Sequence, residues 1–166
     1  QAGCFVSNSI EIVAVDPINL GLNAIDPNCF GESSGSIETL IGGGLEPYQI
    51  SWTGPNGFEA SNDTIEDLSA GEYSIAISDG GGCEFSETIL LSEPDAISIK
   101  LNSAAATCAN IADGSIEAVV SGGTADYTFS WTGPAGFESD QEAINSLNSG
   151  EYILIVTDNN DCEQAD

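Results

Sequence analysis

The sequence predicts an all-β fold in which two β-sandwich modules follow one another. Short runs rich in β-branched and aromatic residues alternate with clusters of Gly, Pro, Asn and Asp, which is typical of sandwiches. No segment keeps the i, i+3, i+4, i+7 apolar spacing of an amphipathic helix over three turns. The cysteines recur at a fixed interval, which indicates an internal repeat.

The repeat has a period of 79 residues. Cys4, Cys83 and Cys162 are separated by this interval, and so are Cys29 and Cys108. Shifting the chain by 79 residues aligns 29–83 with 108–162 without a gap, and 23 of the 55 aligned positions are identical. A single duplicated module explains this match.

Strands are expected in the first module at 36–41, 48–52, 73–78 and 87–91. Trp52 ends the second of these runs, and Trp131 holds the same place in the second module. A sandwich packs a large aromatic residue between its sheets at this point.

A second repeated motif makes the fold prediction more specific. Leu68-x-x-Gly71-x-Tyr73 and its copy, Leu147-x-x-Gly150-x-Tyr152, have the spacing of a tyrosine corner, in which the Tyr hydroxyl bonds to the backbone just upstream. The predicted class is therefore tandem immunoglobulin-like Greek-key β-sandwich modules. We interpret the shared aromatic and leucine residues as structural core, not as ligand-stacking groups: Trp52, Trp131, Tyr73, Tyr152, Leu68 and Leu147.

Two acid–proline pairs mark the module edges. Glu93-Pro94 separates two predicted strands, and Asp16-Pro17 occupies the equivalent place one repeat earlier. Proline donates no hydrogen bond to a strand ladder, so it suits a joint between modules. The expected parts are the trailing last strand of a preceding module at 1–16, module 1 at 17–95, and module 2 at 96–166 without its own last strand.

Residues 1–16 match 80–95, so we expect them to act as a strand donor. An open sandwich edge leaves backbone groups unpaired, and strand addition from a neighbouring copy would fill it. This head-to-tail contact would propagate as a filament. Alternatively the polypeptide continues at both ends, and the same strand fills the same groove covalently. The apolar residues of the donor are Val6, Ile10, Ile12 and Val15.

The charge balance excludes several partners. The chain has 27 Asp and Glu, one basic residue (Lys100) and no His, for a net charge of −26. Nucleic acids and anionic membrane surfaces need a basic face, so neither is an expected partner. Salt or divalent cations should screen the self-repulsion. No run reaches the roughly 18–20 apolar residues of a membrane span.

Catalysis has little support in the composition. Without His there is no Ser–His or Cys–His machinery, and without Arg no guanidinium can clamp an oxyanion. Pairs of carboxylates suited to glycoside hydrolysis would arise by chance among 27 acids. We therefore expect no enzyme and no catalytic residues.

The repeated motif resembles the SprB repeat, which occurs in large surface adhesins of gliding Bacteroidetes. The second copy carries the resemblance in Gly122-Gly123, Tyr127, Ser130-Trp131, Leu147, Gly150, Tyr152, Val156, Asp158 and Cys162, and the first copy departs from it slightly with Ile77 in place of Val156. The resemblance implies an extracellular or cell-surface location, type IX secretion, and a part in adhesion or in building long stalks.

A secreted setting favours disulfides over metal binding, and there is no Cys-x-x-Cys pair. The favoured pairing is within each module, Cys29 with Cys83 and Cys108 with Cys162, which leaves Cys4 for an upstream partner. The rival pairing is Cys4 with Cys29 and Cys83 with Cys108, which leaves Cys162 free.

Two further kinds of site are expected with less support. Asp79, Asp158 and Asp161 lie in acidic turns that could bind calcium, although neither turn matches an EF-hand loop; no other cofactor is expected. Asn62-Asp63-Thr64 is an N-glycosylation sequon by pattern, and Asp63-Thr64-Ile65 resembles the O-glycosylation motif of Bacteroidetes, in which Thr64 would be the modified residue. The second copy has Ala143 in place of Thr64.

Two functional hypotheses follow. In the first, the modules are structural and adhesive parts of a linear stalk or filament, and their partners are neighbouring modules or copies of the chain. In the second, each module binds a ligand such as a surface polysaccharide through loops like 54–58, where Phe58 and its equivalent Phe137 lie.

Overall fold

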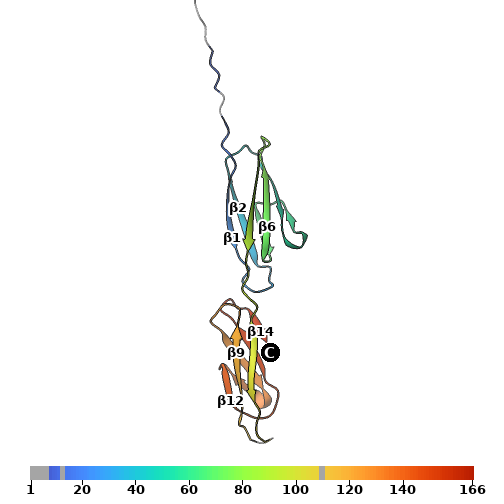
Figure 1. Ribbon diagram of the computed structural model, residues 1–166, viewed down its shortest axis with the longest axis vertical. Coiled ribbons are helices and arrows are strands. Elements are labelled where there is room, and N and C mark those ends of the chain that lie inside the picture. The colour runs from blue at the N-terminus through green and yellow to red at the C-terminus, as the bar shows by residue number, and fades with distance from the viewer. Residues whose placement is uncertain (1–7, 12–13, 109–110) are drawn as a thin grey trace, which may run out of the picture.

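The computed structural model describes residues 8–11, 14–108 and 111–166, and in them two β-sandwiches lie end to end (Figure 1). Module 1 contains β1 (Asn19–Ile25), β2 (Gly35–Gly42), β3 (Gln49–Thr53), β4 (Glu59–Ala60), β5 (Thr64–Leu68), β6 (Gly71–Ser78) and β7 (Glu84–Leu91). Module 2 contains β8 (Ser98–Ala104), β9 (Gly114–Ser121), β10 (Thr128–Gly133), β11 (Phe137–Ser139), β12 (Ala143–Leu147), β13 (Ile153–Thr157) and β14 (Glu163–Ala165). A 3₁₀ turn precedes β4 and β11: η1 (Pro55–Gly57) and η2 (Pro134–Gly136).

Each module has one three-stranded and one four-stranded antiparallel sheet. In module 1 the strand orders are β1-β2-β5 and β4-β3-β6-β7, and in module 2 they are β8-β9-β12 and β11-β10-β13-β14. The same pairings recur in both modules, as the duplicated sequence requires. The predicted all-β sandwich class is confirmed.

Each module has a core of its own, formed by alternate side chains of its strands. In β6, for example, Tyr73, Ile75 and Ile77 are buried while their neighbours face outward, because successive strand residues point to opposite faces. The two clusters of buried residues are Ile37, Trp52, Ile65, Leu68, Tyr73, Ile75, Ile77 and Leu91 in module 1, and Ala118, Trp131, Ile144, Leu147, Leu154 and Val156 in module 2.

The two tryptophans lie between the sheets. Trp52 is 0% exposed and Trp131 is 1% exposed. Their indole N–H groups donate to backbone carbonyls, Trp52 to Asn62 at 3.2 Å and Trp131 to Gln141 at 2.8 Å. Each indole therefore has its polar atom satisfied within its own module, as burial requires.

Both tyrosine corners have the expected hydrogen bond. The Tyr73 hydroxyl donates to the carbonyl of Ser69 at 3.0 Å, and the Tyr152 hydroxyl donates to that of Asn148 at 3.1 Å. Tyr73 is buried, whereas Tyr152 is only half-buried. The corner in module 1 is thus better shielded from water than its copy.

The repeated Gly-Gly pair shapes the end at which the chain enters each module. Gly43 and Gly122 have φ values of +68° and +77°, and a Cβ at either would lie 2.0 Å from a backbone oxygen, that of Pro17 or of Ala96. Only glycine allows the entering segment to pass so close to this turn.

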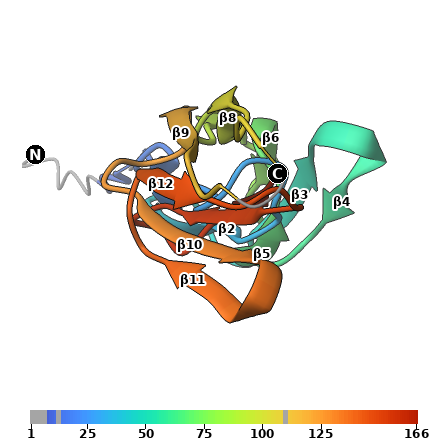
Figure 2. The same cartoon turned by 90° about the horizontal axis from the view of Figure 1, so that it is seen from below.

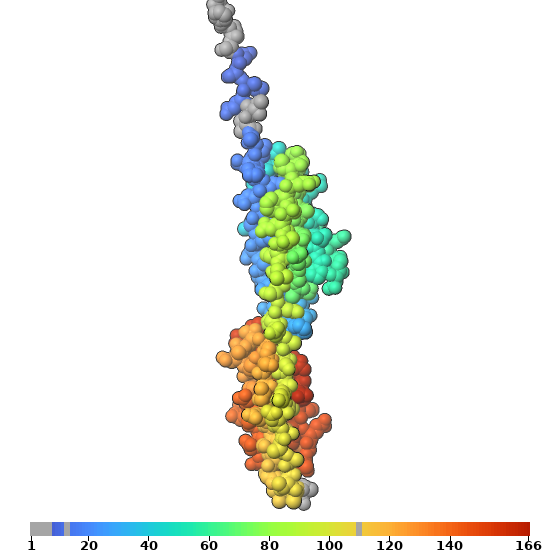
Figure 3. Space-filling view, viewed as in Figure 1, coloured from blue at the N-terminus to red at the C-terminus, as the bar shows by residue number. Residues whose placement is uncertain are grey.

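The chain crosses each module from one end to the other. Gly44 N–H donates to Asp16 at the entry of module 1, and Gly123 N–H donates to Asp95 at the entry of module 2. The space-filling view shows a narrow waist between the modules (Figure 3), and their elements overlap when they are seen along the long axis (Figure 2).

Candidate functional site

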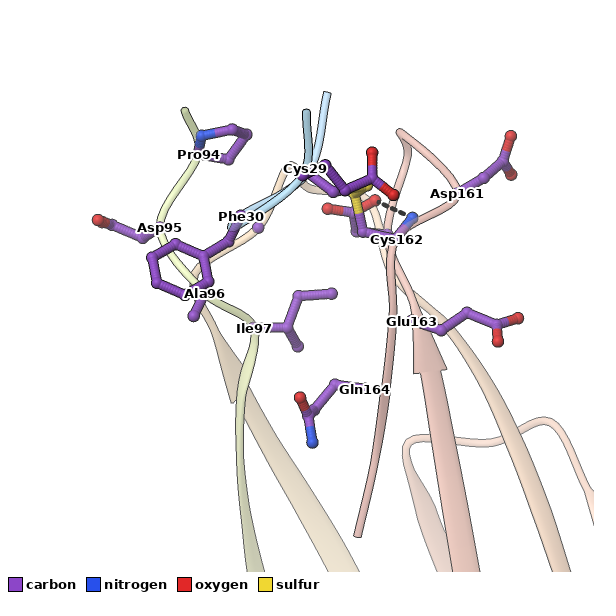
Figure 4. Close-up of a pocket in the computed structure, with 13 residues that line it drawn as sticks. Cys29, Phe30, Pro94, Asp95, Ala96, Ile97, Asp161, Cys162, Glu163 and Gln164 are labelled. Atoms are coloured by element: carbon purple, nitrogen blue, oxygen red, sulfur yellow. Dashed lines mark hydrogen bonds between the residues drawn. A yellow bond between two sulfur atoms is a disulfide. The ribbon is translucent and has the colours of Figure 1, made fainter. Parts of the chain in front are cut away.

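A disulfide between Cys29 and Cys162 joins the two modules (Figure 4). Cys29 lies in the β1–β2 loop, at the far end of module 1, and Cys162 lies in the β13–β14 turn, at the near end of module 2. Their Cα atoms are 5.7 Å apart across 133 residues of sequence. This distance is normal for a disulfide.

The Asp158 carboxylate builds the turn that presents Cys162. It accepts hydrogen bonds from the N–H groups of Thr124 (2.8 Å), Asn160 (2.8 Å) and Cys162 (3.0 Å). Asp161 takes the left-handed conformation, with φ of +63°, so that the chain can reverse. Burial raises the pKa of Asp158, but these hydrogen bonds outweigh it and hold the pKa below its usual value.

The loop that presents Cys29 is closed by hydrogen bonds at both ends. Asn28 N–H donates to the Ser34 hydroxyl at 3.0 Å, and Glu32 N–H donates to the Cys29 carbonyl at 3.2 Å. The linker holds this loop as well, because Gly31 N–H donates to the Glu93 carboxylate at 2.7 Å. Hydrogen bonds on both sides of Cys29 therefore hold the loop that presents it.

Direct contacts across the joint accompany the disulfide. The Asn160 side-chain amide donates to the Asn28 carbonyl at 3.0 Å. A pocket of about 320 Å³ lies beside the disulfide, and Phe30, Pro94 and Ile97 are among the residues that line it. The Phe30 side chain is 59% exposed. The joint thus consists of one short linker, the disulfide, the hydrogen bond between Asn160 and Asn28, and the groove beside them.

The joint is strongly acidic. The carboxylates that line its pocket are those of Glu32, Asp95, Asp158, Asp161 and Glu163. The sequence has a single basic residue to set against all 27 acids. Repulsion opposes close approach of the modules, and the disulfide resists this repulsion whatever the ionic strength.

The predicted pairing within modules is wrong. Cys83 follows the β6–β7 turn, in which Gly80 N–H donates to the Leu45 carbonyl, so Cys83 lies at the end where the chain enters module 1. Cys29 follows β1 and lies at the opposite end of the module. A strand of seven residues separates these two ends by about 23 Å, which no disulfide can span. The same geometry separates Cys108 from Cys162 in module 2.

The rival pairing is also wrong for the residues that the structure describes. It would join Cys83 to Cys108, but Cys83 lies at the entry end of module 1 and Cys108 at the far end of module 2. Neither has a disulfide partner in the described part of the chain. Cys4 lies outside the described residues. Cys162, which the rival pairing left free, is the partner of Cys29.

The aspartates predicted as calcium ligands have a structural use. Asp79 accepts hydrogen bonds from the N–H groups of Leu45, Gly81 and Cys83, just as Asp158 does in module 2. The N–H of Cys83, followed by those of Leu45 and Gly81, lowers the pKa of Asp79 against a smaller opposing effect of burial. Within residues 8–11, 14–108 and 111–166, no group of three or more His, Cys, Asp or Glu could hold a metal ion. Calcium binding at Asp79, Asp158 and Asp161 stays a prediction.

The predicted donor residues are only partly described. Ile10 is 90% exposed and Val15 is 49% exposed, and neither belongs to a strand. Val6 and Ile12 lie outside the described residues. Thr64, the predicted glycosylation site, is exposed at the start of edge strand β5.

The loops considered for ligand binding turn their aromatic residues inward. Phe58 packs edge-on against Tyr73 with ring centres 5.5 Å apart, and Phe137 packs against Tyr152 at 5.3 Å. Both phenylalanines are half-buried. They anchor the 3₁₀ turns η1 and η2, which they directly follow.

Sequence reasoning missed the joint because the repeat hides it. The separation of Cys29 and Cys162 is one repeat longer than that of Cys29 and Cys83, so both pairings obey the same periodicity. The strands between Cys29 and Cys83 were the available signal, because they place these two cysteines at opposite ends of module 1.

Comparisons with known proteins add the following findings. No curated protein matches the chain. The solved structure of an amphioxus IgVJ-C2 molecule is similar at 14% identity with a TM-score of 0.35, covering 92% of this chain and 94% of that one. A segment of two fibronectin type III domains from chicken tenascin has 14% identity and a TM-score of 0.34, covering 92% and 98%. Among the described residues, no helix is long and apolar enough to cross a membrane.

The expected resemblance is confirmed by the family comparison. The model of the SprB repeat matches twice, once in each sandwich, and each match runs from the first strand to the 3₁₀ turn. The two matched segments are residues 22–57 and 102–136.

Proposed function

We propose that the chain is a structural and adhesive part of an extracellular bacterial surface adhesin or filament, in which the modules form a linear stalk. The observation that carries this proposal is the Cys29–Cys162 disulfide, which holds two modules end to end. A second covalent connection beside the linker restrains the angle between modules. A stalk needs this restraint, whereas an isolated binding domain does not.

The path of the chain supports a linear array. Each module is entered at one end and left at the other, so further modules of the same kind would extend the same line. The partners of this chain are then neighbouring modules, or copies of itself in head-to-tail contact.

The proposed extracellular location rests on family and chemistry. SprB repeats are found in surface proteins, and disulfides persist in oxidising surroundings. Type IX secretion and a part in gliding belong to the same proposal. The large negative charge would keep such a β-rich surface soluble.

We also propose that the chain is not an enzyme. SprB repeats and immunoglobulin-like folds are typically non-catalytic. The absence of His from the sequence and its single basic residue support this proposal, because general bases and oxyanion clamps commonly come from those residue types.

A second candidate function is polysaccharide binding, and Phe30 is the observation that favours it. Its ring is largely exposed and lines the pocket at the joint. An exposed aromatic face beside polar groups could stack on a sugar ring. A glycan array tests this function: binding by the wild-type chain that Phe30→Ala abolishes would favour it over a purely structural role.

Small-angle scattering tests the stalk proposal. The oxidised chain should scatter as a stiff rod of two modules, each about 35–45 Å long by strand length. The variant Cys29→Ser/Cys162→Ser should keep both modules folded but scatter as two bodies on a flexible linker. Identical curves for the two proteins would remove the observation on which the proposal rests.

Labelling of native cells tests the location. Antibodies against the chain should bind intact cells, and external protease should remove the signal. Labelling that appears only after lysis would contradict an extracellular role.

A further inference from the structure

Cys83 and Cys108, at opposite ends of the molecule, are the repeat equivalents of Cys162 and Cys29, which form the joint between the modules. Cys83 lies one repeat before Cys162, and Cys108 lies one repeat after Cys29. Both are exposed, and neither has a disulfide partner in the part of the chain that the structure describes. The residues equivalent to them form the Cys29–Cys162 disulfide within the same molecule.

The turn that presents Cys83 is built like the turn that presents Cys162. Cys83 N–H donates to the Asp79 carboxylate at 2.8 Å, and Cys162 N–H donates to that of Asp158 at 3.0 Å. The N–H of each aspartate donates back to the cysteine carbonyl at 3.0 Å. The Cys83 end of module 1 therefore has the geometry of the Cys162 half of the joint.

The loop that presents Cys108 is built like the loop that presents Cys29. Ile111 N–H donates to the Cys108 carbonyl at 3.0 Å, as Glu32 N–H does to that of Cys29 at 3.2 Å. The loop is also closed one residue before each cysteine. Thr107 N–H donates to Asp113 at 2.8 Å, in the place where Asn28 N–H donates to Ser34.

These two ends cannot meet within one chain. The Cys83 turn contacts the residues at which module 1 begins, and the Cys108 loop follows β8, whose other end adjoins the linker. One of these two cysteines therefore lies at each end of the pair of modules.

We propose that a second copy of this chain docks head to tail on the first, with a disulfide between Cys108 of one copy and Cys83 of the next. The proposal rests on the linear array proposed above and adds that its joints are cross-linked. The joint between copies would lack one hydrogen bond of the joint within the chain. In the Cys162 turn the Asn160 side-chain amide donates to the Asn28 carbonyl, whereas the equivalent residue in the Cys83 turn is Gly81, which has no side chain.

Oxidised glutathione, a small disulfide, is a sufficient oxidant for the cross-link. The Cys108 thiolate attacks one glutathione sulfur and releases a first glutathione thiolate. The Cys83 thiolate of the next copy then attacks the Cys108 sulfur of this mixed disulfide and releases the second. Two protein thiols lose two electrons and two protons, and one oxidised glutathione becomes two reduced molecules.

The test uses two variants that each expose one end. Cys4→Ser/Cys83→Ser keeps Cys108, and Cys4→Ser/Cys108→Ser keeps Cys83, while Cys29 and Cys162 stay paired in both. One variant is labelled with ¹⁵N so that mass spectrometry distinguishes mixed dimers from dimers of one variant. Equal amounts are oxidised with glutathione disulfide at about 1 M NaCl, where the Debye length is about 3 Å and the acidic ends repel weakly.

We expect mixed dimers to exceed dimers of one variant by at least about tenfold, a preference of about 1.4 kcal/mol for the head-to-tail contact. The same mixture in urea should lose this preference, since unfolded chains pair at random. Equal amounts of mixed and like dimers without urea would overturn the proposal. So would the absence of dimers when a small thiol reagent shows both cysteines to be reactive. Neither result would contradict the stalk proposal, because its scattering test depends on Cys29 and Cys162 and not on Cys83 and Cys108.

Discussion

Cys29 and Cys162 belong to different modules, and their disulfide spans the joint between two otherwise separate cores. Because neither core includes residues of the other module, the disulfide can stabilise a module only through its unfolded state. When one module unfolds while the other stays folded, the disulfide and the linker still hold the ends of the unfolded segment together, which limits its entropy. We predict that Cys29→Ser/Cys162→Ser lowers the unfolding free energy of each module by roughly 2–4 kcal/mol. Urea unfolding followed by NMR signals of each module measures this. A change below about 0.5 kcal/mol in both modules, the size of an ordinary surface substitution, would contradict this effect of the disulfide.

Each tryptophan should support only its own module. Trp131→Ala should destabilise module 2 by about 3–5 kcal/mol through the cavity it leaves, and the Gln141 carbonyl would also lose its donor. Trp52→Ala should do the same in module 1. The remaining tryptophan provides the control, because its fluorescence should report an unchanged transition in the intact module. A loss under about 1 kcal/mol would contradict the burial of these side chains.

The two tyrosine corners offer a matched comparison. Tyr73→Phe should cost about 1 kcal/mol, since it removes the hydrogen bond to Ser69 and leaves the ring in place. Tyr152→Phe should cost less, because Tyr152 is only half-buried and water can replace the hydroxyl at Asn148. Denaturant unfolding of the two variants measures both values. Equal costs would show that burial does not govern the strength of these bonds.

Local spacing in the sequence was enough to predict the sandwich and its aromatic core. Trp52 and Tyr73 lie in motifs shorter than ten residues, and their roles follow from strand alternation and from one backbone hydrogen bond. Such features depend on neighbours in sequence, so a single chain reveals them.

The joint could not be predicted in the same way, because it depends on which end of a module each loop occupies. In a perfect repeat, a cysteine spacing within a module and a spacing to the next module carry the same pattern. The acidic turns were ambiguous for a related reason. An aspartate that accepts three backbone N–H groups and one that binds calcium look alike in sequence, as Asp79 does.

The Asp158 turn should make module 2 sensitive to acid. The hydrogen bonds to its carboxylate lower its folded pKa, so its contribution to stability is present above the ordinary Asp pKa of about 3.9. That contribution is lost as the pH falls through the lower folded pKa. The difference in unfolding free energy between the wild type and Asp158→Asn should therefore be largest near neutral pH and shrink below about pH 4. Glu138→Gln, which removes an exposed carboxylate on β11, serves as the control. A difference that stays constant from neutral to acid pH would contradict this role of Asp158.

The last strands of the two modules, β7 and β14, are paired with their neighbours over different lengths. In module 1, β6 is paired with β7 along its whole length, from Gly71 opposite Leu91 to Ser78 opposite Glu84. In module 2, β13 is paired with β14 over Ile155–Thr157, with one further backbone pair between Leu154 and Asp166. Residue Ile153, beyond this ladder, is 49% exposed. We predict that an added strand can pair with β13 beyond this ladder.

The segment 1–16 has the residues to fill this edge. By the repeat, Ile10 corresponds to Ile89 and Ile12 to Leu91, and these two side chains pack on the core of module 1. We predict that a peptide of residues 1–16 with Cys4→Ser binds a chain that lacks those residues. NMR shifts should be confined to module 2 around 150–154, where the added strand would supply backbone hydrogen bonds. Ile12→Asp in the peptide should abolish binding, because a charge would replace the apolar side chain that fills the place of Leu91.

The intact chain gives the complementary result. With Cys83→Ser and Cys108→Ser to remove the end cysteines, it should still polymerise at high concentration, because each copy offers its segment 1–16 to module 2 of the next. Removing residues 1–16 from this variant should leave monomers, as ultracentrifugation would measure. An intact chain that stays monomeric at high concentration while module 2 is folded would exclude strand exchange between copies. The same segment could then complete a module only as part of one continuous polypeptide.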